Sequence, residues 1–248
     1  MTVGASASPE KSRPSIFWPL AAIVIPLVGL LARIELRGSE NLPRRGAFVL
    51  APNHHSEIDP LIVAIATWRA GRAPRFLAKE SLFRIPVVGW VLKASGMVPV
   101  ARSRGAAAQA LAQAKELASS ERGVIVYPEG TLTRDPGLWP MRGKSGAIRL
   151  ALAGDIPLIP LAQWGTQAVM PRYGKLSLLP LRKPITVLIG EPLDVSDLRG
   201  RTDQAAIQEG TERLMAAITA LLEELRGEKA PPERWDPTQH GQAETGKL

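Results

Sequence analysis

From residue 34 onward, short apolar segments alternate along the chain with segments of helical periodicity. We predict strands at 34–36, 47–51, 75–78, 97–100, 124–127, 156–161, 175–179 and 185–189. We predict helices at 59–68, 86–94, 104–119, 143–153 and 203–226. Such alternation is typical of a sheet that helices cover, and 248 residues are enough for one such domain. The sequence therefore predicts an α/β domain with a mixed, mostly parallel sheet covered by helices.

An uninterrupted apolar run, 16–32, precedes this domain. A spanning helix needs about 20 apolar residues, so the run is slightly short, and Pro26 in its interior would break or kink a helix. Trp18 and the arginines after the run are typical of a segment at a membrane interface. We therefore predict a membrane-inserted or interfacial hydrophobic hairpin at 16–32, with a buried core helix as the alternative.

The remaining regions complete the predicted organisation. Residues 1–15 are polar and small, which is typical of a disordered terminus. The folded domain is expected at 33–227, and residues 228–248 are expected to form a polar tail.

Composition excludes several kinds of chemistry. The absence of cysteine excludes disulfides, thiolate metal sites and a cysteine nucleophile. The only histidines are His54, His55 and His240, and two adjacent histidines on a strand face opposite ways, so we predict no metal site. The net charge of +8 suits a phosphate substrate, an anionic lipid surface, nucleic acid or an acidic carrier protein. The few aromatic residues are not interleaved with basic ones, so nucleic acid is not an expected partner.

The segment 53–59 reads Asn-His-His-Ser-Glu-Ile-Asp and lies between an apolar strand and an apolar helix. Catalytic groups are frequent on such loops at strand ends. A histidine accepts a proton near neutral pH, and a carboxylate that binds its other nitrogen stabilises the imidazolium that forms. Asp59, in the first turn of the helix, can fold back toward His54 in this way. We therefore expect His54 and Asp59 to be catalytic, against the alternative of a capping aspartate and two surface histidines.

Two further segments are predicted to reach the same edge of the sheet. Segment 127–134 follows an apolar strand, and it offers Gly130, the hydroxyls of Thr131 and Thr133, and the cation of Arg134. These are groups that suit a phosphate. Segment 96–102 is a strand that ends on Arg102. The alternative for each arginine is a solvated surface charge.

Together these segments resemble the glycerolipid acyltransferase family typified by lysophosphatidic acid acyltransferase (PlsC-like). The family's first motif, Asn-His-x-Ser-x-x-Asp, is similar to 53–59, and its second, a Gly-to-Arg strand, to 96–102. Its third, Phe-Pro-Glu-Gly-Thr, is similar to 127–131 with Tyr127 in place of Phe, and its fourth, Ile-Pro-x-x-Pro, to 156–160. The four occur in the family's order. One departure is Leu132, where the family often has Arg or Ser.

The resemblance implies a role for each matching residue. His54 would deprotonate the acceptor hydroxyl, Asp59 would orient His54, and Asn53 and Ser56 would support the loop. Residues implied in binding the acceptor phosphate are Arg102, Glu129, Gly130, Thr131, Arg134 and Lys144, the last from an element similar to the family's Lys-x-Gly. Pro157 and Pro160 are implied in the acyl site. No metal, no cofactor and no covalent acyl-enzyme are implied.

The implied fold is glycerol-phosphate acyltransferase-like, and the implied activity is acyl transfer to lysophosphatidic acid, giving phosphatidic acid. The implied co-substrate is a thioester of coenzyme A or of acyl carrier protein. We expect membrane association, with membrane lipids as partners and the active site on the cytoplasmic face. Alternatives are acylation of glycerol 3-phosphate or of another lysolipid or glycolipid, and a non-catalytic membrane lipid-binding protein. The intact His54 and Asp59 pair disfavours the last.

Overall fold

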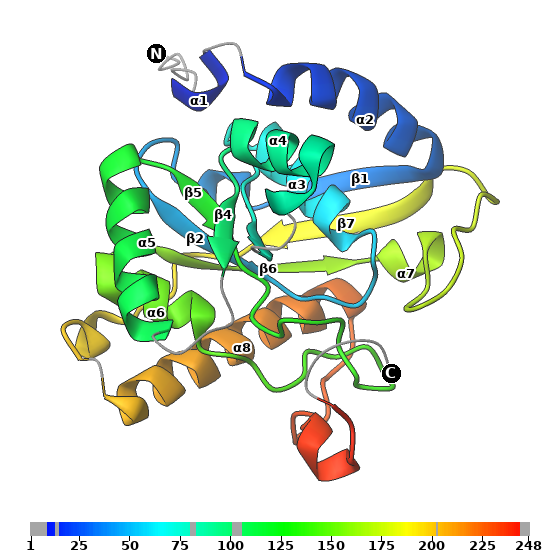
Figure 1. Cartoon of the computed structure of the whole chain (residues 1–248). Coiled ribbons are helices and arrows are strands. Elements are labelled where there is room, and N and C mark those ends of the chain that lie inside the picture. The colour runs from blue at the N-terminus through cyan, green and yellow to red at the C-terminus, as the bar shows by residue number, and fades with distance from the viewer. Residues whose placement is uncertain (1–8, 13–14, 80–82, 101–105, 202, 244–248) are drawn as a thin grey trace, which may run out of the picture.

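A computed structural model of the chain describes residues 9–12, 15–79, 83–100, 106–201 and 203–243 (Figure 1). Its strands are β1 (Ala32–Arg37), β2 (Phe48–Pro52), β3 (Leu77–Lys79), β4 (Val98–Val100), β5 (Gly123–Ile125), β6 (Leu158–Trp164) and β7 (Lys183–Ile189). Its α-helices are α1 (Pro9–Ser12), α2 (Phe17–Leu31), α3 (Asp59–Arg69), α4 (Pro86–Ala94), α5 (Ala106–Ser120), α6 (Gly146–Gly154), α7 (Thr166–Val169) and α8 (Gln204–Arg226). Short 3-10 turns lie at Ser39–Asn41, Ser196–Leu198 and Pro237–His240.

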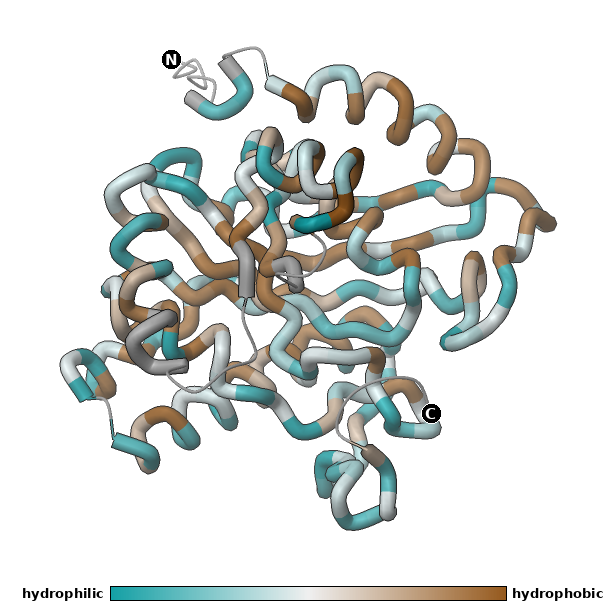
Figure 2. The backbone as a smooth tube through the Cα atoms, in the orientation of Figure 1, coloured by the Kyte–Doolittle hydropathy of each residue, from teal (hydrophilic) through white to brown (hydrophobic). Residues whose placement is uncertain are grey.

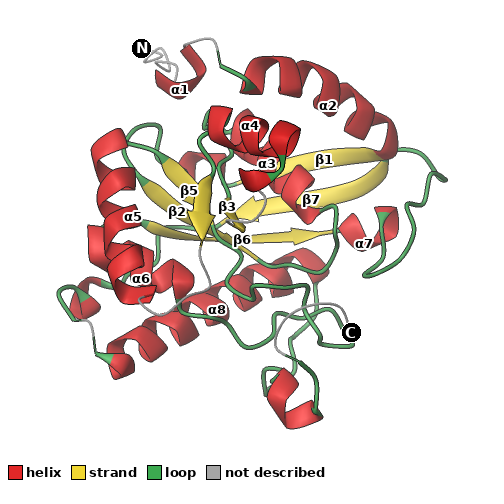
Figure 3. Cartoon of the chain, in the orientation of Figure 1, coloured by secondary structure: helices red, strands yellow, loops and turns green. Residues whose placement is uncertain are grey.

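Five strands form one sheet in the order β1-β7-β6-β2-β5. Neighbouring strands are parallel except β6 and β7, which are antiparallel. Strands β3 and β4 form a parallel pair, and a bridge between Phe76 and Ile125 joins this pair to the edge at β5. The predicted mixed, mostly parallel sheet is confirmed, and Figure 3 shows helices on both of its sides.

Each face of the sheet buries its own apolar cluster. One cluster combines strand residues such as Leu50 and Ile159 with Val28 of α2 and Ile62 of α3. The other combines alternate strand residues such as Val49 with side chains of α5, α6 and α8. Strands β2, β5 and β6 are buried on both faces because helices cover both, as is usual for parallel sheets. This burial holds the carboxyl end of β2, from which the segment 53–59 emerges.

The apolar run at 16–32 forms one helix, α2, so the predicted hairpin is wrong. Pro19 lies in the first turn, where no intrahelical partner is lost, and Pro26 is accommodated inside the helix. Phe17 and Val28 are buried against the domain, while the opposite side of α2 is exposed. Among the described residues, no helix combines the length and the apolar character that crossing a membrane requires.

The strand predicted at 175–179 is a loop, which contradicts that prediction. Its alternating leucines resemble a strand, but the segment has no partner strand among the described residues, and it joins α7 to β7. The other predicted strands and helices match observed elements within a few residues. The helix that was predicted to begin at residue 143 begins three residues later, at Gly146.

The polar tail packs against the domain through the described part of its length. Backbone N–H of Arg142 donates to the carbonyl of Trp235 at 2.9 Å, and the N–H of Ala230 donates to Glu223 at 2.9 Å. Ala230 also packs against a small apolar cluster around Trp139. The tail therefore lies over the segment that connects β5 to α6.

Candidate active site

His54 lies just beyond the carboxyl end of β2, and Asp59 is the first residue of α3. The Nδ1 of His54 lies 3.1 Å from Oδ2 of Asp59. A carboxylate only accepts hydrogen bonds, so Nδ1 carries the proton and Nε2 carries a lone pair. The His54 side chain is 15% exposed, whereas Asp59 is fully buried. This pair can take a proton from a hydroxyl that reaches Nε2.

The carboxylate of Asp59 also holds the backbone of the loop. Its Oδ2 accepts from the N–H of His55 at 2.7 Å and from the N–H of Ser56 at 2.8 Å. Burial alone raises the pKa of Asp59, but the attraction of His55 and the hydrogen bond from His54 leave that pKa below its ordinary value. The start of α3 also favours a negative charge there. Asp59 is therefore ionised at neutral pH, which suits the partner of a general base.

Glu129 ties the histidine loop to a second loop. Its Oε1 accepts from the N–H of His54 at 2.9 Å, and its Oε2 accepts from the N–H of Met141 at 3.1 Å. Burial raises the pKa of this carboxyl to about 8. Both oxygens of Glu129 are occupied by backbone donors, so the side chain positions the two loops. A direct contact of this carboxylate with a phosphate finds no support in the geometry.

His55, unlike its neighbour, is fully buried. Its Nδ1 lies 3.0 Å from Nδ2 of Asn53, and its Nε2 lies 2.7 Å from Oγ1 of Thr166 and 3.0 Å from Oε1 of Gln167. Burial lowers the pKa of His55. The second histidine is thus a buried part of the scaffold, and His54 is the one whose side chain is partly exposed.

The two predicted supporting residues fix the loop to β6 and to the segment after α7. Asn53 is buried, accepts from the N–H of Gln163 at 2.9 Å and donates to its carbonyl at 3.2 Å. The hydroxyl of Ser56 donates to the carbonyl of Met170 at 2.6 Å. Because this hydroxyl is committed to Met170, Ser56 is a scaffold residue.

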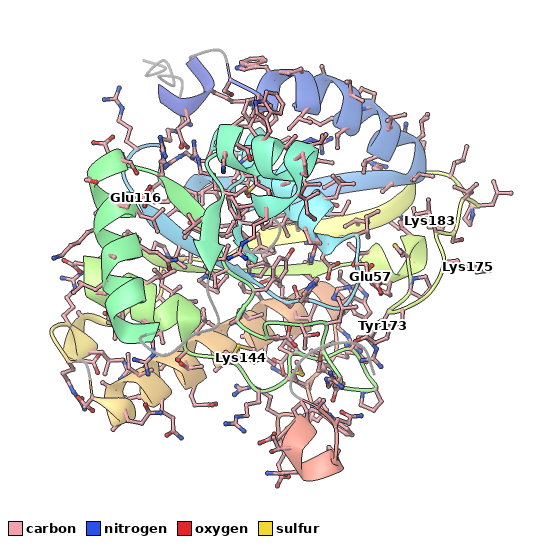
Figure 4. All side chains as sticks on the ribbon, in the orientation of Figure 1. Glu57, Glu116, Lys144, Tyr173, Lys175 and Lys183 are labelled. Atoms are coloured by element: carbon pink, nitrogen blue, oxygen red, sulfur yellow. The ribbon has the colours of Figure 1, made fainter. Side chains whose placement is uncertain are left out.

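The turn at Gly130 and the side chain of Lys144 come together. Gly130 has φ +69°, a conformation that favours glycine. A Cβ at Gly130 would lie 3.1 Å from Cδ of Lys144, and the N–H of Lys144 donates to the carbonyl of Pro128 at 2.6 Å. Thr131 is half-buried at the same turn. Three of the residues expected to bind phosphate, Gly130, Thr131 and Lys144, therefore lie side by side. Lys144 is labelled in Figure 4.

Two more cations, Arg134 and Arg102, are expected to bind phosphate. Arg134 is buried at 2% exposure, so it is no solvated surface charge. Arg102 follows β4 but lies outside the described residues. For both, phosphate binding stays a prediction.

A cavity of about 650 Å³ opens beside Glu129 and Lys144. Its walls come from the segment 141–145, from α8 and from the polar tail, including Arg142 and Arg234. The walls also carry Glu212 and Asp236, and these carboxylates form ion pairs with Arg234 and Arg142. Lys144 lies in the same wall beside the Gly130 turn, and a cation there can bind an anionic group.

The two prolines expected in the acyl site lie away from the histidine. β2 and β6 are parallel, with Val49 opposite Leu158 and Pro52 opposite Leu161. Pro157 therefore lies at the opposite end of these strands from His54. Pro160 is a buried residue within β6, and its carbonyl accepts from the N–H of Gly190 at 2.9 Å. An acyl-site role for either residue finds no support in this arrangement.

Several residues at the site were not predicted from sequence. Thr166, Gln167 and Met170 hold the histidine loop, but no motif marks them. The Tyr127 ring packs on the His54 ring, with centroids 4.1 Å apart, and its buried hydroxyl has no hydrogen-bond partner among the described residues. The only sequence signal for Tyr127 is its position, where the similar family has Phe.

Residues 33–164 match the family model described as Acyltransferase. The chain belongs to the acyltransferase family. Several curated relatives of this acyltransferase are named 1-acyl-sn-glycerol-3-phosphate acyltransferase. The chloroplastic protein of Brassica napus is 32% identical over 141 residues, which cover 56% of this chain and 39% of the relative. The protein of Limnanthes douglasii is 30% identical over 180 residues, covering 72% and 60%. The protein of Borreliella burgdorferi is 34% identical over 157 residues, covering 62% and 60%.

The acyltransferase therefore spans between 39% and 60% of the length of these three relatives. Its fold resembles the crystal structure of the 1-acyl-sn-glycerophosphate acyltransferase of Thermotoga maritima. The TM-score is 0.62 at 23% identity, over 87% of this chain and 82% of that one. At this identity the likeness establishes the shared fold, and it covers helices and sheet alike.

Proposed function

We propose that this acyltransferase transfers a fatty acyl group from a thioester to the free hydroxyl of lysophosphatidic acid, giving phosphatidic acid. The observation that carries the proposal is the 3.1 Å contact between His54 Nδ1 and the buried Asp59 carboxylate. It leaves Nε2 as a base on the exposed side of the pair. The names of the relatives support the choice of acceptor.

The reaction uses His54 as base and then as acid. Nε2 takes the proton of the acceptor hydroxyl while the oxygen attacks the thioester carbonyl carbon. Asp59 stabilises the imidazolium that forms. When the tetrahedral intermediate collapses, the carbon–sulfur bond breaks and the thiolate takes the proton from His54. The products are an ester and a free thiol, and no enzyme residue is acylated.

The acceptor phosphate lies, in this proposal, near the Gly130 turn and Lys144, with Thr131, Arg134 and Arg102 as further contacts. The position of the Lys144 side chain beside the Gly130 turn supports this assignment. The donor is acyl coenzyme A or acyl carrier protein. Glycerol 3-phosphate and other lysolipids, including glycolipids, are alternative acceptors, because they present the same hydroxyl chemistry.

We propose that the enzyme acts at a membrane, because both of its proposed substrates carry acyl chains. The exposed apolar side of α2 supports contact with membrane lipids, and we propose that this contact is on the cytoplasmic face of the cell membrane.

The test is an assay of the purified full chain with several acceptors and both donor types, with products identified by mass spectrometry. We expect phosphatidic acid from lysophosphatidic acid, and its formation should be about 10²–10⁴-fold slower in the His54→Ala variant. A protein that binds these lipids but forms no acylated product with any donor would contradict the proposal. Preferred acylation of glycerol 3-phosphate would replace the acceptor.

A further inference from the structure

Residues 175–182 form an exposed apolar loop between α7 and β7, here called the leucine loop. The exposed fractions are 45% for Leu176, 58% for Leu178, 76% for Leu179 and 55% for Leu181. In Figure 2 the brown tip of this loop projects from the end of the molecule at which α2 joins β1. Four exposed leucines in one short loop indicate a surface that binds an apolar partner.

Three backbone carbonyls of the leucine loop accept hydrogen bonds from nearby side chains. The side chain of Lys183 is buried, and its Nζ donates to the carbonyls of Ser177 at 2.9 Å and of Pro180 at 2.8 Å. The Ser177 hydroxyl donates to the carbonyl of Leu179 at 3.0 Å. An apolar medium offers no hydrogen bonds, so a segment that enters it must satisfy its own polar groups. The carbonyls of Ser177, Leu179 and Pro180 meet that requirement, and the four leucines are exposed.

The leucine loop contacts the C-terminal end of α2, whose other side is exposed. The backbone N–H of Arg182 donates to the carbonyl of Leu30, the second-last residue of α2, at 3.1 Å. The side chains of Ile23, Leu27 and Leu30 are each more than half exposed. Leu30 and Arg182 are 152 residues apart in sequence, and this bond brings the leucine loop against the C-terminal end of α2.

Cations flank the leucines of the loop. Lys175 and Arg182 are exposed at its two ends, and Arg33 is exposed just after α2. Figure 4 shows Lys175 on the outer side of the molecule, whereas Lys183 lies on β7. An apolar tip between exposed cations matches a bilayer surface that carries anionic head groups.

The leucine loop is also attached to the site. Glu57, in the histidine loop, accepts from the N–H of Tyr173 at 2.9 Å, and Ser56 donates to Met170. The N–H of Ser177 donates to the carbonyl of Val169 at 2.8 Å. Hydrogen bonds therefore attach the segment that carries the leucines to the histidine loop.

We propose that the leucine loop inserts into an anionic bilayer beside α2 and forms a second membrane contact of this acyltransferase. Leu178, Leu179 and Leu181 enter the acyl region, and Lys175 and Arg182 bind the head groups. This inference deepens the membrane association proposed above. Binding to vesicles can be measured without any turnover, so the two proposals can fail separately.

The first test measures flotation of the full chain with vesicles of phosphatidylglycerol and phosphatidylcholine. The variant combines Leu178→Ser and Leu179→Ser. Loss of two exposed leucines should lower the partition coefficient on the order of tenfold or more. The matched control is Leu111→Ser, an exposed leucine on α5, which should leave binding unchanged. Binding of the double variant within about twofold of the wild type would overturn the inference.

The second test addresses the cations. Lys175→Gln with Arg182→Gln should weaken binding to the anionic vesicles by about fivefold for each charge, and it should leave binding to pure phosphatidylcholine unchanged. An unchanged preference for anionic vesicles would overturn the assignment of the head-group contacts.

The third test separates docking from chemistry. With a short-chain lysophosphatidic acid below its micelle concentration, the Leu178→Ser, Leu179→Ser variant should retain wild-type turnover, whereas it should lose turnover with the acceptor in vesicles. Equal loss on both acceptors would overturn the inference, because it would assign the loop to positioning the site through Tyr173. A wild-type chain that floats but never acylates would contradict only the proposed function.

Discussion

His54 and His55 are neighbours in the chain with different surroundings. One is partly exposed and bound to a carboxylate, and the other is buried among Asn53, Thr166 and Gln167. Sequence alone indicated which histidine would be catalytic, because the spacing to Asp59 resembles a known motif. It could not indicate that His55 is a buried scaffold residue, because its partners Thr166 and Gln167 lie more than 100 residues away.

Removal of each histidine should therefore have a different effect. His54→Ala should lower kcat by about 10²–10⁴-fold and leave the melting temperature near the wild-type value. His55→Ala should lower the melting temperature, because it leaves buried polar groups of Asn53 and Thr166 without partners. Kinetics and thermal unfolding of both variants measure this. A fully active His54→Ala enzyme would exclude His54 as the base.

Glu129 predicts a pH dependence of stability. Its pKa is about 8 in the folded chain and 4.5 without burial, so between these values the folded chain holds a proton that the unfolded chain releases. The stability from this proton is complete below pH 4.5 and is lost as pH rises through 8. Glu129→Gln has no such proton. The wild-type free energy of unfolding should therefore fall between pH 5 and 8, relative to the variant, by up to about 1.4 kcal/mol per pH unit.

Urea unfolding of both proteins at pH 5, 6.5 and 8 measures these slopes. Only the slopes are compared, because the glutamine amide faces a backbone N–H of His54 or Met141 and lowers stability at every pH. Parallel profiles would show that Glu129 is ionised at pH 7.

Helices and strands could be predicted where apolar residues recur with a regular pattern in the sequence. Strands β2, β5 and β6 are apolar on both faces, and α8 has an apolar stripe ended by Gly227. The prediction failed at 175–179, where alternating leucines indicate a strand but the side chain of Lys183 bonds the backbone into a loop. The prediction of a hairpin at 16–32 also failed. The segment is the single helix α2, which tolerates Pro26 in its interior because one side of the helix packs on the domain.

The two sides of α2 should have separable effects. Leu27 is exposed and Val28 is buried, although they are adjacent in the helix. Leu27→Ser should weaken vesicle binding and leave stability unchanged. Val28→Ala should lower the free energy of unfolding by about 1–3 kcal/mol, because it leaves a cavity in the core, and it should leave vesicle binding unchanged.

Flotation and urea unfolding of the two variants distinguish these effects. Point substitutions are preferable to deletion of the first 31 residues, because the deletion would also remove Phe17 and Val28 from the core. If Leu27→Ser destabilises the fold as Val28→Ala does, α2 belongs wholly to the core.

The charge of the whole molecule predicts its response to salt. With a net charge of +8, the enzyme should bind anionic vesicles more weakly as ionic strength rises, because the screening length falls from about 10 Å at 0.1 M to about 3 Å at 1 M. Binding to neutral vesicles should not weaken. Flotation at 0.05 and 0.5 M salt measures this, and salt-independent binding to anionic vesicles would exclude an electrostatic contribution.

The architecture as a whole was predictable in class but not in arrangement. Alternation of strands and helices indicates a covered, mostly parallel sheet. Nothing in local sequence indicates that β7 runs antiparallel to β6, or that the polar tail packs over the segment before α6. These depend on contacts between segments that are distant in sequence.

The contacts of the histidine loop decide how long a fragment of the chain must be to keep this loop in place. Its bonds reach Glu129 and Gln163 and then continue to Thr166, Met170 and Tyr173. A fragment that ended at residue 164, where the family match ends, would contain all four motifs. It would still lack the partners of His55, Ser56 and Glu57. The smallest piece able to hold His54 in place is therefore longer than the piece that is recognisable by sequence.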